Sequence, residues 1–248
     1  MARSQGIVRL IGTIDGVTYT EGVYGRIIRS KSSLDKAKMD SNPKYDILRL
    51  YQRELSLFSK YGSLLRSGIS AELNQVKVAI GAQRLNKLLV KLKDLDSTNR
   101  LGARIVSEGM KTPRGKVILK NFDFYGNTKL SNLLSKTFEL DKATGTISIA
   151  DFNPAKDVFA PKKASHVQFK ALLIGLDAET SKFCVQRSVA VNLALVDATA
   201  DLVLAPIDLP RVTTQVFYVV QVLFYKETNG FQDLTARRSA TLTILEVG

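Results

Sequence analysis

The hydrophobic pattern of the chain changes near residue 115, and this change constrains the fold more than any other feature of the sequence. Between residues 44 and 110, apolar side chains recur every three or four positions, which is the period of an amphipathic α-helix. After residue 116, short β-branched runs alternate with turn-forming clusters, which is typical of antiparallel strands. We therefore predict an α+β fold with a helical middle region and a C-terminal antiparallel β-sandwich.

The N-terminal residues predict a small antiparallel meander. Extended segments are expected at 7–14, 17–20 and 24–29, and Asp15-Gly16 between the first two is a strong hairpin signal. A polar linker follows and ends in Asn42-Pro43, a typical helix start. Because a small hairpin is only marginally stable in water, we expect the meander to pack on another surface.

The middle region predicts one long helix and three shorter ones, at about 70–80, 82–95 and 98–110, and Thr112-Pro113-Arg114-Gly115 closes it. The long helix carries a single apolar stripe, which consists of Tyr45, Leu48, Tyr51, Leu55, Phe58 and Leu65. Strands are expected at 117–119, 146–149, 166–173, 183–195, 213–225 and 240–247. The run 216–225 is apolar on both faces, which predicts a central strand.

The chain is strongly basic, and the basicity lies in its first half. We expect two domains, 1–115 and 116–248, of which the first holds 21 Lys+Arg against 10 Asp+Glu and the second 15 against 13. One interpretation is a phosphate-contacting surface on the helices. The other is a set of solvated helix faces, or faces that meet an acidic partner.

Residue types that carry common chemistry are scarce. With one Cys (Cys184) and one His (His166), the chain cannot form an internal disulfide or a zinc site of the usual kind. No phosphate-binding loop or serine-hydrolase signature is present, and Asp94-x-Asp96 lacks the rest of a calcium loop. We therefore expect that the protein binds no metal or cofactor and is not an enzyme. The alternative that the spacing of the Asp and Glu residues leaves open is a hydrolase that uses only carboxylates.

Two further expectations concern location. No apolar run approaches the roughly 18 residues of a membrane-spanning helix, so we expect no membrane span. The N-terminus has no apolar stretch behind Arg3, so we expect no secretory signal and synthesis in the cytoplasm. The sequence leaves open that the protein reaches an extracellular or phage-like assembly by a route that needs no such signal.

Several segments spread over most of the chain form a pattern together: Gly12-Thr13-Ile14-Asp15-Gly16-Val17-Thr18-Tyr19, Asn42-Pro43-x-Tyr45, Phe122-Asp123-Phe124, Ala160-Pro161 and Ser165-His166-Val167-Gln168-Phe169. Together they resemble a family of uncharacterised Bacteroidetes proteins of similar length, from whose usual residues Asn42 and Tyr45 depart conservatively. The resemblance implies an N-terminal hairpin, a helical middle and a C-terminal β domain. It implies no activity, and no functional residues transfer with it.

These observations favour a non-enzymatic structural subunit that self-assembles into a filament, tube or phage-derived particle. Strand addition to a neighbouring copy, through residues 6–29 or 240–247, is the expected mechanism. The apolar side chains expected at the contact are Ile7, Leu10, Ile14, Val17 and Tyr19. The alternative is a nucleic-acid-binding protein, with phosphate contacts at Arg84, Lys87, Lys91 and Lys93.

Overall fold

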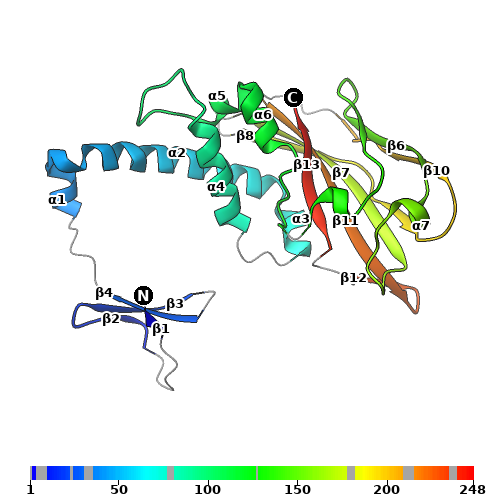
Figure 1. Cartoon of the computed structure of the whole chain (residues 1–248), viewed down its shortest axis with the longest axis horizontal. Coiled ribbons are helices and arrows are strands. Elements are labelled where there is room, and N and C mark those ends of the chain that lie inside the picture. The colour runs from blue at the N-terminus through cyan, green and yellow to red at the C-terminus, as the bar shows by residue number, and fades with distance from the viewer. Residues whose placement is uncertain are drawn as a thin grey trace. The chain divides into compact units, whose positions relative to one another are not determined.

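The computed structural model describes residues 2–3, 10–22, 25–30, 36–76, 81–126, 128–177, 182–208, 215–234 and 239–248. These residues form helices and three antiparallel sheets, which confirms the predicted α+β class (Figure 1). The chain divides into two compact units, Met1–Gln52 and Arg53–Gly248. The expected domain boundary at Gly115 therefore falls inside the second unit, whose helices and strands share a core.

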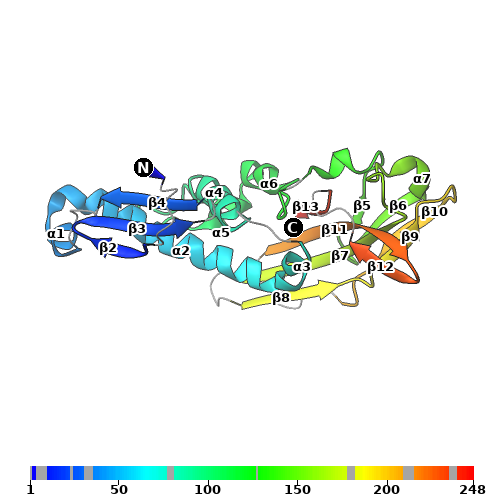
Figure 2. The ribbon, with the colours of Figure 1, turned by 90° about the horizontal axis from the view of Figure 1, so that it is seen from below.

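The first unit contains the predicted meander, as a sheet in the order β1-β4-β3-β2 (Figure 2). Its strands are β1 (Ala2–Arg3), β2 (Gly12–Ile14), β3 (Val17–Gly22) and β4 (Gly25–Ser30). Asp15 and Gly16 have φ angles of 48° and 76°, as a tight turn between β2 and β3 requires. The short helix α1 (Lys36–Ser41) and the 3-10 turn η1 (Pro43–Tyr45) follow, and Asn42 caps η1 by accepting a hydrogen bond from the Lys44 amide.

The helical region ends later than the sequence pattern indicates. Its helices are α2 (Asp46–Gly68), α3 (Ser70–Gln75), α4 (Gly81–Lys93), α5 (Val106–Lys111) and α6 (Pro113–Leu119). The prediction of a strand at 117–119 is therefore wrong. The Thr112 side chain accepts a hydrogen bond from the Gly115 amide at 3.0 Å, and Pro113 occupies the first helical position. The segment 112–115 thus begins a helix instead of closing the region.

The large C-terminal sheet is built around two long strands. It has six strands: β7 (His166–Asp177), β8 (Lys182–Arg187), β9 (Val191–Ala194), β11 (Gln215–Thr228), β12 (Phe231–Leu234) and β13 (Thr241–Val247). β11 pairs with β7 continuously from Gln215 opposite Leu176 to Tyr225 opposite His166, and with β13 and β12 on its other side. The prediction of a central strand at 216–225 is confirmed.

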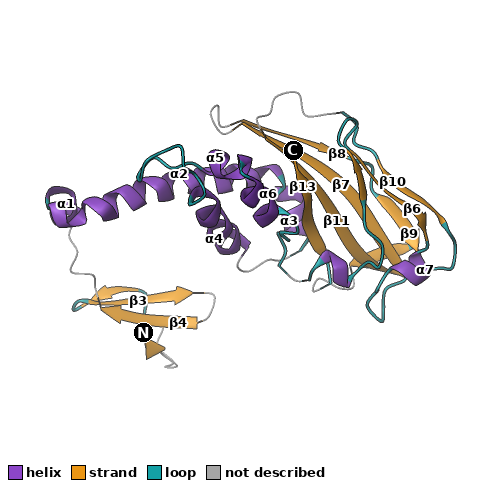
Figure 3. Ribbon diagram, turned by 45° about the horizontal axis from the view of Figure 1, so that its top comes forward, coloured by secondary structure: helices purple, strands orange, loops and turns teal. Residues whose placement is uncertain are grey.

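Each face of this sheet lies against a different layer (Figure 3). Phe217, Val219 and Leu223 of β11 pack into one core with α2–α6. Val220, Val222 and Phe224 of the same strand pack into a second core with the three-stranded sheet β10-β6-β5. That sheet consists of β5 (Glu139–Asp141), β6 (Thr146–Phe152) and β10 (Ala200–Leu204); η2 (Leu130–Asn132) and α7 (Pro154–Asp157) lie in its connections.

A buried carboxylate joins the helical layer to the sheet. Glu72 of α3 is fully buried and accepts hydrogen bonds at 2.9 Å from Lys170 of β7 and Arg187 of β8. Arg187 also donates to the Gly68 carbonyl at the end of α2. Burial by itself raises the pKa of Glu72, but the hydrogen bonds from Arg187 and Lys170 outweigh it and the net pKa is lowered. These contacts fix the end of α2 against the sheet.

Candidate assembly interface

The structure places three of the five predicted contact residues, Ile14, Val17 and Tyr19, in the N-terminal sheet. Leu10 and Ile14 are 43% and 50% exposed, and Val17 and Tyr19 of β3 are half-buried. Ile11, which was not predicted, is 65% exposed. Ile7 lies outside the described residues.

The first unit lacks a hydrophobic core in the part that the structure describes. No side chain among the described residues 10–22, 25–30 and 36–52 is buried. A sheet of this size needs a packed apolar face to be stable by itself. In the part that the structure describes, this sheet lacks such a face.

The first half of helix α2 also has exposed apolar side chains. Phe58 and Leu65 of the predicted stripe are buried in the helical core, whereas Leu48, Tyr51 and Leu55 are exposed. The spacing of the stripe was predicted correctly, but its burial ends about halfway along the helix. Periodicity identifies the apolar side of a helix and does not reveal how far its partner surface extends.

Sheet edges determine where strand addition can occur. β2 is the last strand of the N-terminal sheet, and β8 pairs with β7 alone among the strands that the structure describes. β13 is different, because its outer edge is met by the segment after α6. The amides of Asn121 and Phe124 donate to the carbonyls of Ile244 and Leu242, both at 2.8 Å. β13 therefore has hydrogen-bond partners on both edges, β11 on one and the segment after α6 on the other. This arrangement conflicts with the expectation that residues 240–247 add to the sheet of a neighbouring copy.

The four predicted phosphate contacts on α4 have different surroundings. Lys87 and Lys91 are exposed. Arg84 is partly buried, with its guanidinium carbon 5.5 Å from the centre of the Phe122 ring. Lys93 is buried and lies 2.9 Å from Glu54, so its ammonium group faces the protein interior. Only two of the four therefore lie on an open cationic surface.

Glu54 is the centre of a buried ion cluster beside this surface. Its carboxylate accepts two hydrogen bonds from Arg104 and one from the Gly102 amide, each at 2.8 Å, in addition to its contact with Lys93. The hydrogen bonds from Arg104 are the largest cause that lowers the pKa of Glu54 from 4.5 to about 2. The cluster fixes α2 to α4 and to the segment before α5, where α2 enters the core.

The described residues contain no candidate metal cluster and no Cys–His pair. No three His, Cys, Asp or Glu side chains among them are grouped to hold a metal ion. Cys184 pairs with Gly175 of β7, which puts it about 30 Å from His166 at roughly 3.3 Å per residue along that strand. The two side chains therefore do not form a nucleophile–base pair. No helix in the described part of the chain has the length and apolarity to cross a bilayer.

Comparison with known proteins finds no matching family model, no matching curated protein and no matching solved structure. The resemblance to the Bacteroidetes family stays a prediction.

The Glu54 cluster predicts an acid-dependent loss of stability. Replacing Glu54 by Gln leaves Lys93, which is buried, and Arg104, which is partly buried, with the half-exposed Asp94 as their remaining carboxylate, and it should lower the unfolding free energy at pH 7 by about 3 kcal/mol. Because the folded-state pKa is depressed, the carboxylate stabilises fully above about pH 4.5 and loses this effect as the pH falls toward 2. The wild type and Glu54→Gln should therefore differ less at pH 3 than at pH 7 in urea denaturation.

A suitable control is Glu108→Gln, because Glu108 forms an ion pair with Lys111 at the surface of α5. We expect this control to change the unfolding free energy by less than about 1 kcal/mol at either pH. If Glu54→Gln lowers the unfolding free energy equally at pH 3 and at pH 7, the stabilising role of the Glu54 carboxylate is contradicted.

Proposed function

We propose that this protein is a non-enzymatic structural subunit that self-assembles into a homopolymer, such as a filament, a tube or a phage-derived particle. The observation that carries the proposal is the N-terminal sheet, whose described side chains form no buried core. A sheet with an apolar, uncovered surface gains stability when a second chain covers it. In a homopolymer, this second chain is another copy of the same protein.

Strand addition is the proposed contact. Among the described strands β2 pairs with β3 alone, and Leu10, Ile11 and Ile14 in or beside it supply exposed apolar side chains. Addition to a sheet edge satisfies the backbone groups and buries such side chains at the same time. The exposed part of the α2 stripe supplies further apolar area.

We assign β8 of the neighbouring copy as the acceptor edge. β8 ends the large sheet on the side away from β13, and its Phe183 is 44% exposed. A contact between β2 of one copy and β8 of the next joins two different surfaces. Such head-to-tail contacts produce rings or open helical filaments instead of closed two-fold dimers.

The apolar contact is tested by Ile14→Asp. Burying a charge in the contact is unfavourable, so the variant should shift the protein from polymer toward the 27.4 kDa monomer in light scattering coupled to size-exclusion chromatography. Ile207→Asp is the matched control, because Ile207 is 83% exposed in the second unit and should leave the mass unchanged. A monomeric wild type, or an Ile14→Asp polymer of unchanged mass, would contradict self-assembly through this sheet.

The strand pairing is tested with the chain's single cysteine, Cys184 of β8. In a series of Gly12→Cys, Thr13→Cys and Ile14→Cys, one position should bring the new thiol close to Cys184 of a neighbouring copy. Disulfides need Cβ atoms about 3.5–4.5 Å apart, so mild oxidation should give a covalent ladder on a non-reducing gel for that position only.

The control for the ladder is Thr18→Cys, which lies opposite Thr13 on the inner strand β3. Cys184→Ser should abolish the ladder in every variant. A polymer that yields no ladder at any β2 position would exclude pairing between β2 and β8 while leaving assembly itself intact.

The nucleic-acid alternative rests on the two exposed lysines of α4, Lys87 and Lys91. If they contact phosphates, the logarithm of the DNA-binding constant should fall linearly with the logarithm of salt concentration. The double variant Lys87→Gln/Lys91→Gln should then reduce that slope by about 2. Fluorescence anisotropy with labelled duplex DNA measures this slope, and a wild-type slope near zero would exclude the alternative.

A further inference from the structure

A cavity of about 630 Å³ lies in the second unit, and none of its lining residues belongs to β2 or β8. Its lining comes from the segment after α6, from η2 and the chain that follows it, from β5 and from the end of β13. This volume lies within the range of about 300–1,000 Å³ that is typical of small-molecule sites. Eleven of the 14 lining residues lie between residues 120 and 142, and Phe159, Leu245 and Glu246 complete the cavity by tertiary packing, which local sequence patterns do not indicate.

The lining of the cavity is mixed: six of its 14 residues are hydrophobic and eight are polar or charged. Six hydrophobic side chains line it: Leu130, Leu134, Phe138, Leu140, Phe159 and Leu245. Leu134 belongs to the core between the two sheets, and four of the others pack against that core. Phe159 is 57% exposed, so the apolar lining reaches the surface. A ligand that fills this space needs an apolar body.

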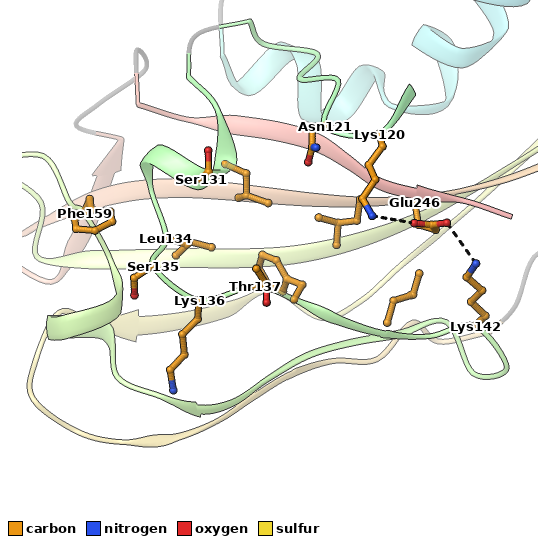
Figure 4. A pocket seen from close by; sticks show the side chains of 14 residues that line it. Lys120, Asn121, Ser131, Leu134, Ser135, Lys136, Thr137, Lys142, Phe159 and Glu246 are labelled. Atoms are coloured by element: carbon orange, nitrogen blue, oxygen red, sulfur yellow. Dashed lines mark hydrogen bonds and ion pairs between the residues drawn. The ribbon is translucent and has the colours of Figure 1, made fainter. Parts of the chain in front are cut away.

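The rim of the cavity carries more positive than negative charge. Lys120 and Lys142 approach the same carboxylate, that of Glu246, at 3.5 Å and 3.4 Å, and they flank it in Figure 4. Both distances exceed the 2.7–2.9 Å that is usual for a charge-assisted hydrogen bond. Among the described lining residues Glu246 is the sole carboxylate. Two ammonium groups therefore share one carboxylate at this end of the cavity.

The third lysine of the lining is engaged elsewhere. Lys136 donates to the carbonyl of Ala150 at 3.0 Å and to that of Asp151, and it lies 3.7 Å from the Asp157 carboxylate. Its role is to hold the lining segment against β6. The charge that a ligand would meet is therefore that of Lys120 and Lys142.

We propose that this cavity binds an amphipathic monocarboxylate, such as a medium-chain fatty acid. The carboxylate would lie between Lys120 and Lys142, and the alkyl chain would lie along the six hydrophobic side chains. Cationic ligands are disfavoured by the two ammonium groups. Highly charged phosphates are disfavoured because six hydrophobic side chains line the cavity and Lys120 and Lys142 already share the Glu246 carboxylate.

The test is a calorimetric titration of the full chain with octanoate, decanoate and dodecanoate, each below its micelle concentration. Each methylene that becomes buried should tighten binding about fourfold. Dodecyltrimethylammonium, with the same chain and the opposite charge, should bind at least tenfold more weakly than dodecanoate. Equal affinities for these two ligands, or no dependence on chain length, would overturn the proposal.

Variants separate this site from general attraction to a basic protein. Lys120→Gln/Lys142→Gln should weaken dodecanoate binding about tenfold, the effect of losing two partly exposed ion pairs. The matched control Lys111→Gln/Lys156→Gln removes the same charge from two surface lysines outside the lining, each also paired with a carboxylate. Glu246→Gln should tighten binding about threefold, because it removes a competing carboxylate. Equal weakening by both double variants would overturn the site.

A fluorescence measurement locates the ligand independently. The chain has no Trp, so Phe159→Trp places a single indole at the cavity. Saturating dodecanoate should shift its emission to shorter wavelength. Phe183→Trp, at an exposed position of β8 outside the lining, should show no shift. A shift in the second variant and not in the first would place the ligand elsewhere and contradict the proposal.

Discussion

The pairing of β7 with β11 is the interaction on which the rest of the second unit depends. The two strands stay in register along the whole of the paired segment, and their side chains alternate between the two faces. Leu172 and Ile174 of β7 face the helices, while Phe169 and Ala171 face the small sheet. One ladder of hydrogen bonds therefore supports two separate hydrophobic cores. A shift of one residue would exchange the faces of every side chain on a strand.

Charged groups are used inside this unit to attach the helices. Glu72 links α3 to β7 and β8, and Glu54 links α2 to α4 and the following segment. Each carboxylate is fully buried and each has two cationic partners. A buried carboxylate without such partners would be strongly destabilising. Part of the excess of Lys and Arg in the first half of the sequence thus balances buried acids and is not available to a polyanion.

The two units contrast in how they use apolar residues. In the second unit, side chains such as Leu65 and Phe217 are fully buried, whereas described apolar residues of the first unit stay exposed or half-buried. α2 belongs to both units, and its apolar stripe passes from the uncovered part into the core at Phe58. This contrast is the reason that assembly is proposed for the first unit and ligand binding for the second.

Local signals determined much of the fold. Asp15-Gly16 specified its turn because the chain there needs positive φ angles, and the apolar run 216–225 specified a strand buried on both faces. The signal at Thr112-Pro113 was equally local, but it was interpreted as a helix end when it is a capped helix start. The helical region therefore ends at Leu119 and not near residue 115.

Tertiary structure alone decided where the charges and the cavity lie. Lys87 and Lys93 look alike in the sequence, yet one is exposed and the other is buried against Glu54, because the packing of α2 decides which lysine meets a carboxylate. Lys120, Lys142 and Glu246 meet only because β13 returns beside the segment after α6. Sequence periodicity determines which side of an element is apolar, since that depends on neighbours three or four positions away. What covers that side depends on long-range packing, which local spacing does not encode.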